Sequence, residues 1–320
     1  MTTETRTLSN GMKIPIIGLG TSKIVKPEEI VYNSIKHGVR LIDTAYIYKN
    51  ENLVGIGIKN AIKDGLCKRE DLIIIGKVWL HFRDDPEKAL KETLKKLQLD
   101  YIDLYLDHWP SGIDHRKEED IRIDPLGSFK MVSIYDFWPK MEALVEKKEN
   151  GKPLARAIGV SNYNIQCLSN LLSFCKVRPV VNQIEFHLYY IQKTLKEFCD
   201  KENIAVISYY PMARGNGARI YIRDNPGTEF DIFQDSYLNK LAKKYNKTPG
   251  QIILKWHNLM GCIPIPSTSK KDRFVENLAS FDFDFDLKKE DFEELSGHFK
   301  QMSLKKFCGC KRFFGINILA

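Results

Sequence analysis

The sequence has no apolar run that approaches the roughly 20 residues needed by a membrane-spanning helix. Its first ten residues, MTTETRTLSN, lack the apolar stretch of a signal peptide. The chain is 43% hydrophobic and 28% charged, which is typical of a globular protein with a full core. We therefore expect a cytoplasmic protein with no membrane partner.

The sequence also lacks a disulfide framework and metal-ligand spacing. Its seven cysteines are an odd number and are scattered, at Cys67, Cys167, Cys175, Cys199, Cys262, Cys308 and Cys310. This pattern is typical of reduced thiols. Only the last two are close together, and no His or second Cys pair lies near them in sequence, so we expect no metal site.

Positive charge is in only modest excess. The net charge of +8 is spread over many Lys-rich helix faces, which argues weakly for anionic ligands and against a nucleic-acid partner. The dinucleotide fingerprint of a Rossmann fold is missing as well. Its best candidate, Gly18-Leu-Gly20-Thr-Ser-Lys23, has Lys in place of the third glycine.

What the sequence does contain is a repeated alternation of short apolar runs with helical patterns. The predicted strands are Ile16–Gly18, Leu41–Thr44, Leu72–Trp79, Tyr101–Trp109, Ala155–Ser161, Val180–Phe186, Ala205–Tyr210 and Cys262–Pro266. The predicted helices are Glu28–His37, Leu53–Lys63, Pro86–Leu97, Phe137–Lys148, Ile165–Phe174, Ile191–Lys201 and Tyr237–His257, with a capping box at Thr248-Pro-Gly-Gln251 that starts a new helix inside the last. Before them, Asn10-Gly11 predicts the turn of an N-terminal hairpin.

Eight apolar strands, each followed by a helix, predict a parallel sheet covered by helices, and at 320 residues a (β/α)8 TIM barrel fits better than an open sheet. We expect a single domain over 1–320, with the barrel at about 5–281 and a C-terminal extension at 282–320. Two long loops, 110–135 and 211–235, follow the fourth and seventh strands. In such barrels active sites form at this end of the strands.

Polar residues stand at three successive strand ends. Asp43 ends the second strand, with Tyr48 five residues later, Lys77 ends the third and His108 ends the fourth. In a barrel these ends are neighbours on one rim, so the four side chains can meet. Taken singly, a strand-end Asp or Lys is more often solvated, and a His beside Trp109 is more often a packed residue.

Side-chain chemistry suggests roles for such a cluster. A tyrosine has an ordinary pKa of about 10, and a nearby ammonium lowers it by favouring the phenolate. A carboxylate behind the Lys keeps the ammonium charged and in place. The tyrosine could then protonate an oxygen that gains negative charge, a contribution of roughly 10²–10⁴ in rate, while the histidine orients the same carbonyl.

The motifs that carry these residues resemble the aldo-keto reductases, and among them the aldose, aldehyde and xylose reductases. They are Asp43-Thr-Ala-x-x-Tyr48-x-Asn50-Glu51, Lys77-Val-Trp79, Asp100-Tyr-Ile-Asp-Leu-Tyr-Leu-Asp-His108-Trp109-Pro110, Gly159-Val-Ser161-Asn162 and Asn182-Gln183-Ile-Glu185, in unbroken order from about 5 to 281. The resemblance implies hydride transfer from a nicotinamide cofactor to a carbonyl carbon. Tyr48 would donate the proton, Asp43 and Lys77 would tune it, and His108 would orient the carbonyl.

The resemblance also implies a cofactor site. Ser161, Asn162 and Gln183 would hold the nicotinamide carboxamide, and Tyr209 would stack on its ring. Arg214 belongs to a loop that would fold over the pyrophosphate. The remaining cofactor positions are Thr21, Ser267, Thr268, Arg273, Glu276 and Asn277, the last five in the region of the adenosine 2′-phosphate. NADPH is therefore the expected cofactor.

Three positions depart from the family pattern. Ser267 replaces a Lys after the Ile-Pro of the eighth strand, which leaves use of NADH open although Lys270 and Lys271 are near. Ser22 replaces a pocket Trp, so Trp79 and Trp109 remain as candidate walls of the substrate pocket, or as core aromatics. Asp107 stands where relatives carry an apolar residue, and it either perturbs His108 or faces a polar helix junction.

The leading hypothesis is therefore a cytoplasmic NADPH-dependent reductase of aldehydes, with open-chain aldoses among its candidate substrates, present as a monomer or weak homodimer. A second hypothesis is a cofactor-binding barrel that acts as a regulatory or structural subunit. A barrel that uses another cofactor on phosphorylated substrates fits the fold but not the motifs.

Overall fold

A computed structural model describes residues 4–113, 129–130, 132–149, 151–213, 231–270, 272–281 and 285–300. Expectations for Arg214, Lys271, Cys308 and Cys310, for most of the 110–135 and 211–235 loops and for the end of the extension fall outside these ranges. Within them, no helix is both long and apolar enough to cross a membrane.

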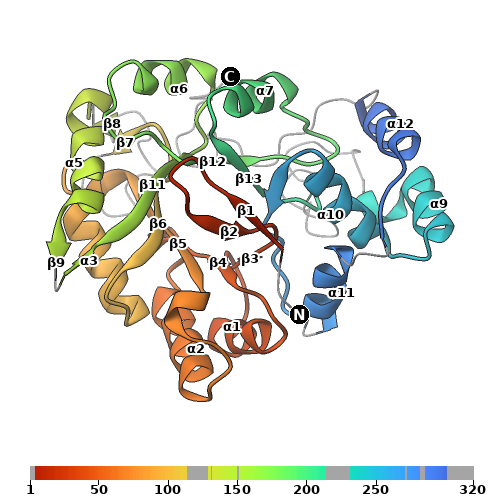
Figure 1. The fold of residues 1–320 in the computed structure, drawn as a ribbon, viewed down its shortest axis with the longest axis horizontal. Coiled ribbons are helices and arrows are strands. Elements are labelled where there is room, and N and C mark those ends of the chain that lie inside the picture. Colours follow the sequence, from red (N-terminus) through yellow and green to blue (C-terminus); the bar gives the residue numbers. More distant parts are fainter. Residues whose placement is uncertain are drawn as a thin grey trace.

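Eight parallel strands form the central sheet, in the order β14-β13-β12-β11-β6-β5-β4-β3 (Figure 1). Their bounds are β3 (Leu19–Gly20), β4 (Leu41–Asp43), β5 (Ile73–Val78), β6 (Ile102–Asp107), β11 (Ala155–Ser161), β12 (Val181–Glu185), β13 (Ala205–Tyr209) and β14 (Cys262–Pro264). The helices around it are α1 (Pro27–Lys36), α2 (Glu51–Lys63), α3 (Pro86–Leu97), α5 (Ile134–Glu146), α6 (Ile165–Leu172), α7 (Lys193–Lys201), α9 (Ser236–Lys244), α10 (Pro249–Leu259), α11 (Asp272–Leu278) and α12 (Lys289–Lys300). The predicted (β/α)8 barrel is confirmed.

The ring closes between its first and last strands. The backbone N–H of Gly18 donates to the carbonyl of Pro264 at 3.0 Å, and that of Gly20 donates to Pro266 at 3.1 Å. Gly20 suits this closure because a Cβ there would lie 2.9 Å from both the carbonyl oxygen of Ile265 and the hydroxyl of Ser267.

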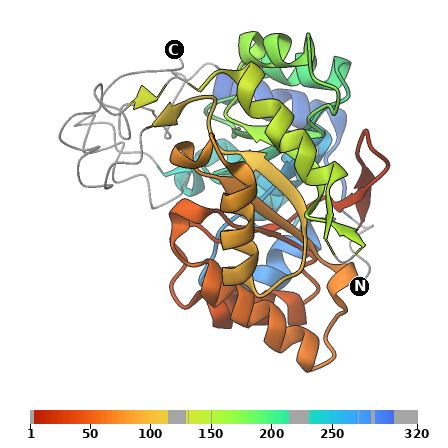
Figure 2. The same ribbon diagram turned by 90° about the vertical axis from the view of Figure 1, so that its left-hand side faces the viewer.

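A hairpin of β1 (Thr5–Thr7) and β2 (Lys13–Pro15) covers one end of the barrel, as the Asn10-Gly11 turn predicted (Figure 2). Its Leu8, Met12 and Ile14 share one buried cluster with residues from the barrel strands, among them Leu41, Ile73, Leu104, Val181, Ile207 and Ile263. The hairpin therefore plugs the barrel interior. At the opposite end, β7 (Gly112–Ile113) pairs with β8 (Phe129–Lys130).

Local sequence explains where the helices begin. In α3, Asp85 accepts a hydrogen bond from the backbone N–H of Lys88 and Pro86 occupies the first turn. In α10, Thr248 and Gln251 form the predicted capping box, which confirms the helix start there. Each of the other helices whose bounds were predicted begins and ends within about three residues of them, whereas α11 was given no bounds.

The predicted position of the first barrel strand was wrong. It was predicted at Ile16–Gly18 but lies at Leu19–Gly20, because the N–H of Ile16 pairs with the carbonyl of Glu4 and extends the hairpin instead. Patterning also missed α12 and a short hairpin of β9 (Lys148–Glu149) and β10 (Lys152–Pro153).

Candidate active site

The ends of β4 and β5 place Asp43 and Lys77 side by side. The Lys77 ammonium Nζ lies 2.6 Å from Oδ2 of Asp43, and both side chains are almost completely buried. The same ammonium lies 3.0 Å from the carbonyl of Thr44 and 3.3 Å from the phenol oxygen of Tyr48. The three-residue 3₁₀ turn Tyr46–Tyr48, which follows β4, brings this tyrosine to the pair. Three residues of the predicted four-residue cluster therefore meet directly.

Burial lowers the pKa of Lys77 below its ordinary value, and the charge of Asp43 opposes that shift. A second group also binds the carboxylate, because Nε2 of Gln183 donates to Oδ2 of Asp43 at 2.8 Å. The Asp43 carboxylate is thus held from two sides. This arrangement fixes the ammonium beside the phenol of Tyr48.

His108 follows β6 and lies next to Tyr48. Their ring centroids are 6.0 Å apart in an edge-to-face arrangement, and the ring of Trp79 packs edge-on against His108 at 5.1 Å. Burial, and to a smaller extent the charge of Lys77, lowers the pKa of His108 well below its usual range. The imidazole is therefore neutral at pH 7, and it can donate one N–H to an acceptor.

The three predicted carboxamide-binding residues and Tyr209 form one hydrogen-bond chain at the same rim, in which the Asn162 amide donates to the Ser161 hydroxyl at 3.1 Å. The hydroxyl of Ser161 donates to the carbonyl of Gln183 at 2.8 Å. The Asn162 amide donates to the carbonyl of His108 at 2.9 Å, and its oxygen accepts from the Tyr209 hydroxyl at 2.7 Å. The structure brings these four residues together with the strand-end cluster.

A cleft of ≈ 630 Å³ lies between the loop after β3 and the segment that connects β14 to α11. It is lined by five predicted residues, Ser22, Ser267, Thr268, Arg273 and Asn277. It is also lined by Lys23, Lys270 and by apolar residues such as Met212 and Phe233. Lys23 was not predicted, although a cation beside Ser22 is visible in the sequence. Three cations in one cleft suit an anionic ligand.

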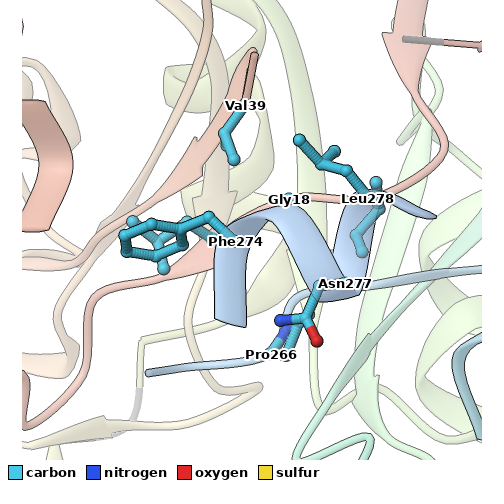
Figure 3. Close-up of a pocket in the computed structure, with 8 residues that line it drawn as sticks. Gly18, Val39, Pro266, Phe274, Asn277 and Leu278 are labelled. Atoms are coloured by element: carbon cyan, nitrogen blue, oxygen red, sulfur yellow. The ribbon is translucent and has the colours of Figure 1, made fainter. Parts of the chain in front are cut away.

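Asn277 and Glu276 occupy neighbouring positions on α11 with different surroundings. In Figure 3 the amide of Asn277 lies beside Pro266. Both residues line a void of only ≈ 10 Å³, together with Gly18, Val39, Phe274 and Leu278. Glu276 accepts a hydrogen bond from the Thr248 hydroxyl at 2.6 Å and lies 3.5 Å from the Arg273 guanidinium. It therefore holds Arg273 in position at the cleft.

The remaining predicted residues are more deeply buried. The hydroxyl of Thr21 donates to the carbonyl of Asp43 at 2.9 Å, so its side chain supports the strand end. Trp79 and Trp109 are each 4% exposed, and Trp79 reaches the site through its contact with His108. A role of Trp109 in the substrate pocket stays a prediction.

Asp107 faces a polar junction outside the barrel, which is one of its two predicted surroundings. It is ion-paired with Arg83 and accepts a hydrogen bond from the Tyr163 hydroxyl at 2.6 Å. Burial raises the pKa of this carboxyl, and the charge of Arg83 opposes the shift. Sequence patterning missed both partners, because Arg83 lies in a loop after β5 and Tyr163 lies just after β11.

Comparisons with known proteins agree with this geometry. The model of the Aldo/keto reductase family matches residues 17–300. The chain is 36% identical to aldose reductase C of Dictyostelium discoideum, over 90% of this chain and 87% of that protein. It is also 36% identical to an NADPH-dependent D-xylose reductase of Meyerozyma guilliermondii, over 91% of this chain and 92% of that protein. It also resembles the crystal structure of a Bombyx mori aldo-keto reductase in complex with NADP, with a TM-score of 0.83, 34% identity and coverage of 98% and 97%.

The chain therefore belongs to the aldo/keto reductase family. As a member of that family it is an oxidoreductase that depends on a nicotinamide cofactor. The residues present fit such a group: the cleft carries Lys23, Lys270 and Arg273 for phosphates, and it lies on the rim that also presents Tyr209 and the polar residues beside it.

Proposed function

We propose that this protein reduces aldehydes to alcohols with NADPH, with open-chain aldoses among its substrates and Tyr48 as the proton donor. The observation that carries the proposal is the contact of the Lys77 ammonium with both Asp43, at 2.6 Å, and the Tyr48 oxygen, at 3.3 Å, beside the ring of His108. When bound, the nicotinamide supplies a hydride to the carbonyl carbon.

The protein supplies the proton and the orientation. Tyr48 gives its phenolic proton to the carbonyl oxygen as that oxygen gains negative charge, and the Lys77 ammonium stabilises the phenolate that remains. Asp43 keeps the ammonium in place. His108 donates an N–H to the same carbonyl oxygen and so fixes the angle at which the substrate lies.

The cofactor is proposed to lie across the rim and the cleft. Ser161, Asn162 and Gln183 offer donors and acceptors for the carboxamide, and Tyr209 offers a ring face for stacking. Arg273 is 45% exposed on its side chain, so its guanidinium is accessible to the 2′-phosphate of NADPH. Since Ser267 supplies no charge, NADH is expected as a weaker second cofactor.

The relatives support the class of substrate. One is named an aldose reductase, another an NADPH-dependent D-xylose reductase, and the Bombyx mori structure contains NADP. Ser22 fits the same class, because a small hydroxyl side chain in place of a Trp suits a polar substrate better than a flat apolar one.

Absorbance of the reduced nicotinamide tests the proposal directly. Purified full-length protein should oxidise NADPH, and more slowly NADH, with a reactive aromatic aldehyde and with D-xylose. Failure to turn over any aldehyde with either nucleotide would refute it. In that case, binding of the nucleotide without turnover would favour the regulatory-subunit hypothesis.

A further inference from the structure

We propose that Arg83, Asp107 and Tyr163 are positioning residues for His108. This inference rests on the proposed function, in which His108 orients the substrate carbonyl. The Arg83 guanidinium is paired with the Asp107 carboxylate, and its Nη1 also donates to the carbonyl of Trp109 at 2.9 Å. One guanidinium thus holds the residue before His108 and the residue after it.

Two residues that follow β11 bind the same segment. The Tyr163 hydroxyl donates to Oδ2 of Asp107 at 2.6 Å, and the Asn162 amide donates to the carbonyl of His108 at 2.9 Å. Asp107, which ends β6, and the two residues after it are therefore each bound by a polar side chain. The backbone of His108 has little freedom to shift along or across the rim.

The ring of His108 is held by the segment that also carries Arg83. A 3₁₀ turn, Leu80–Phe82, separates Trp79 from Arg83, and Trp79 packs edge-on against the imidazole. Arg83 is itself fixed, since its guanidinium lies 4.1 Å from the centre of the Phe137 ring and its side chain is 2% exposed. The loop after β5 therefore constrains both the ring and the backbone of His108.

A purely structural role is the competing explanation. A buried ion pair gives little net stability compared with well-packed apolar residues, because desolvation offsets the Coulombic gain. The pair is thus better explained by the geometry that it imposes. The chain offers a matched control, because Asp103 lies on the same strand, is equally buried and pairs with Arg69 at 2.8 Å and Arg156 at 2.9 Å.

The test compares Asp107→Asn with Asp103→Asn, each alone and combined with His108→Gln. A displacement of about 1 Å at a reacting group can cost roughly 100-fold in rate. We expect Asp107→Asn to lower kcat for aldehyde reduction at least about ten-fold, with the KM for NADPH little changed. In the His108→Gln background the same substitution should have almost no further effect, since its target is gone. Asp103→Asn should lower the melting temperature but leave kcat unchanged.

Unchanged kcat in Asp107→Asn would overturn the proposal. So would a loss that persists undiminished in the His108→Gln background, because the pair would then act independently of the histidine. If Asp107→Asn does not fold, Tyr163→Phe removes one hydrogen bond to Asp107 and should show a smaller loss with the same dependence on His108.

A second measurement does not require turnover and so separates this inference from the proposed function. The chain has seven histidines, and in protein labelled with ¹⁵N-histidine the ring signals that vanish in His108→Gln identify this residue. Those signals should shift or broaden in Asp107→Asn and Tyr163→Phe but not in Asp103→Asn. Identical His108 signals in all three variants would refute the positioning role even if the protein reduced no aldehyde.

Discussion

Replacing Lys77 with methionine tests the link between the buried ion pair and the proton donor. The substitution keeps an unbranched side chain but removes the ammonium that contacts Asp43, the carbonyl of Thr44 and the Tyr48 oxygen. The Asp43 carboxylate is 2% exposed and accepts from two side chains, Lys77 and Gln183. The substitution would leave it only the Gln183 amide, at 2.8 Å. Both stability and activity should therefore suffer.

The two losses have different sizes and causes. Removing one partner of a buried pair costs about 3–5 kcal/mol in the free energy of unfolding, because a charge is left buried without its counter-ion. Loss of the cation that stabilises the Tyr48 phenolate should lower kcat at least roughly 10²-fold. Denaturant unfolding measures the first effect and NADPH oxidation with an aldehyde measures the second.

The double variant Asp43→Asn/Lys77→Met separates these effects. With both charges removed, no lone buried charge remains, so most of the lost stability should return. Turnover should stay low, since the ammonium beside Tyr48 is still absent. Recovery of turnover in the double variant, or a kcat within a few-fold of wild type in the single variant, would contradict the reasoning.

Three further predictions concern the cofactor cleft and the core. Arg273→Gln should raise the KM for NADPH at least about ten-fold and change the KM for NADH little, because only NADPH carries the 2′-phosphate; equal changes for both would exclude this role. Burial lowers the pKa of His257 to about 3. As the pH falls from about 6.5 to 3, only the unfolded state therefore binds the proton, and this residue alone should reduce the free energy of unfolding by roughly 1.4 kcal/mol per pH unit. His257→Gln should flatten that acid dependence in denaturant unfolding, and equal slopes for the two proteins would count against it. Gly20→Ala should destabilise the barrel closure by about 1–3 kcal/mol, since a Cβ there would lie 2.9 Å from the carbonyl oxygen of Ile265. As a control, Gly297→Ala in α12 adds a Cβ with no atom within 4 Å and should not lower the melting temperature.

Much of the fold could be predicted because its signals are local. Eight apolar runs alternate with helical patterns, and the capping box at Thr248 marks a helix start without any tertiary information. The first strand was misplaced because Ile16 and Ile17 are buried, at 5% and 2% exposure, although neither belongs to the barrel sheet. An apolar run shows that a segment is buried but not which neighbour it pairs with.

The Asp43–Lys77–Tyr48 contact could be predicted for a geometric reason. Once the strands are assigned to a parallel barrel, the ends of adjacent strands must meet at one rim, and their polar residues come together. The contacts between elements that are not adjacent could not be predicted. The bond from Gln183 to Asp43 crosses from β12 to β4, and the pairing of Arg83 with Asp107 depends on where a loop turns after β5.

The most direct test of the central claim follows NADPH oxidation in single turnover, with the nucleotide bound in advance and a reactive aromatic aldehyde as substrate, in wild type and Tyr48→Phe. The substitution removes only the phenolic oxygen and keeps the ring. We predict that the rate falls at least roughly 10²-fold while the affinity for NADPH changes little. A rate near that of wild type would show that Tyr48 is not the proton donor.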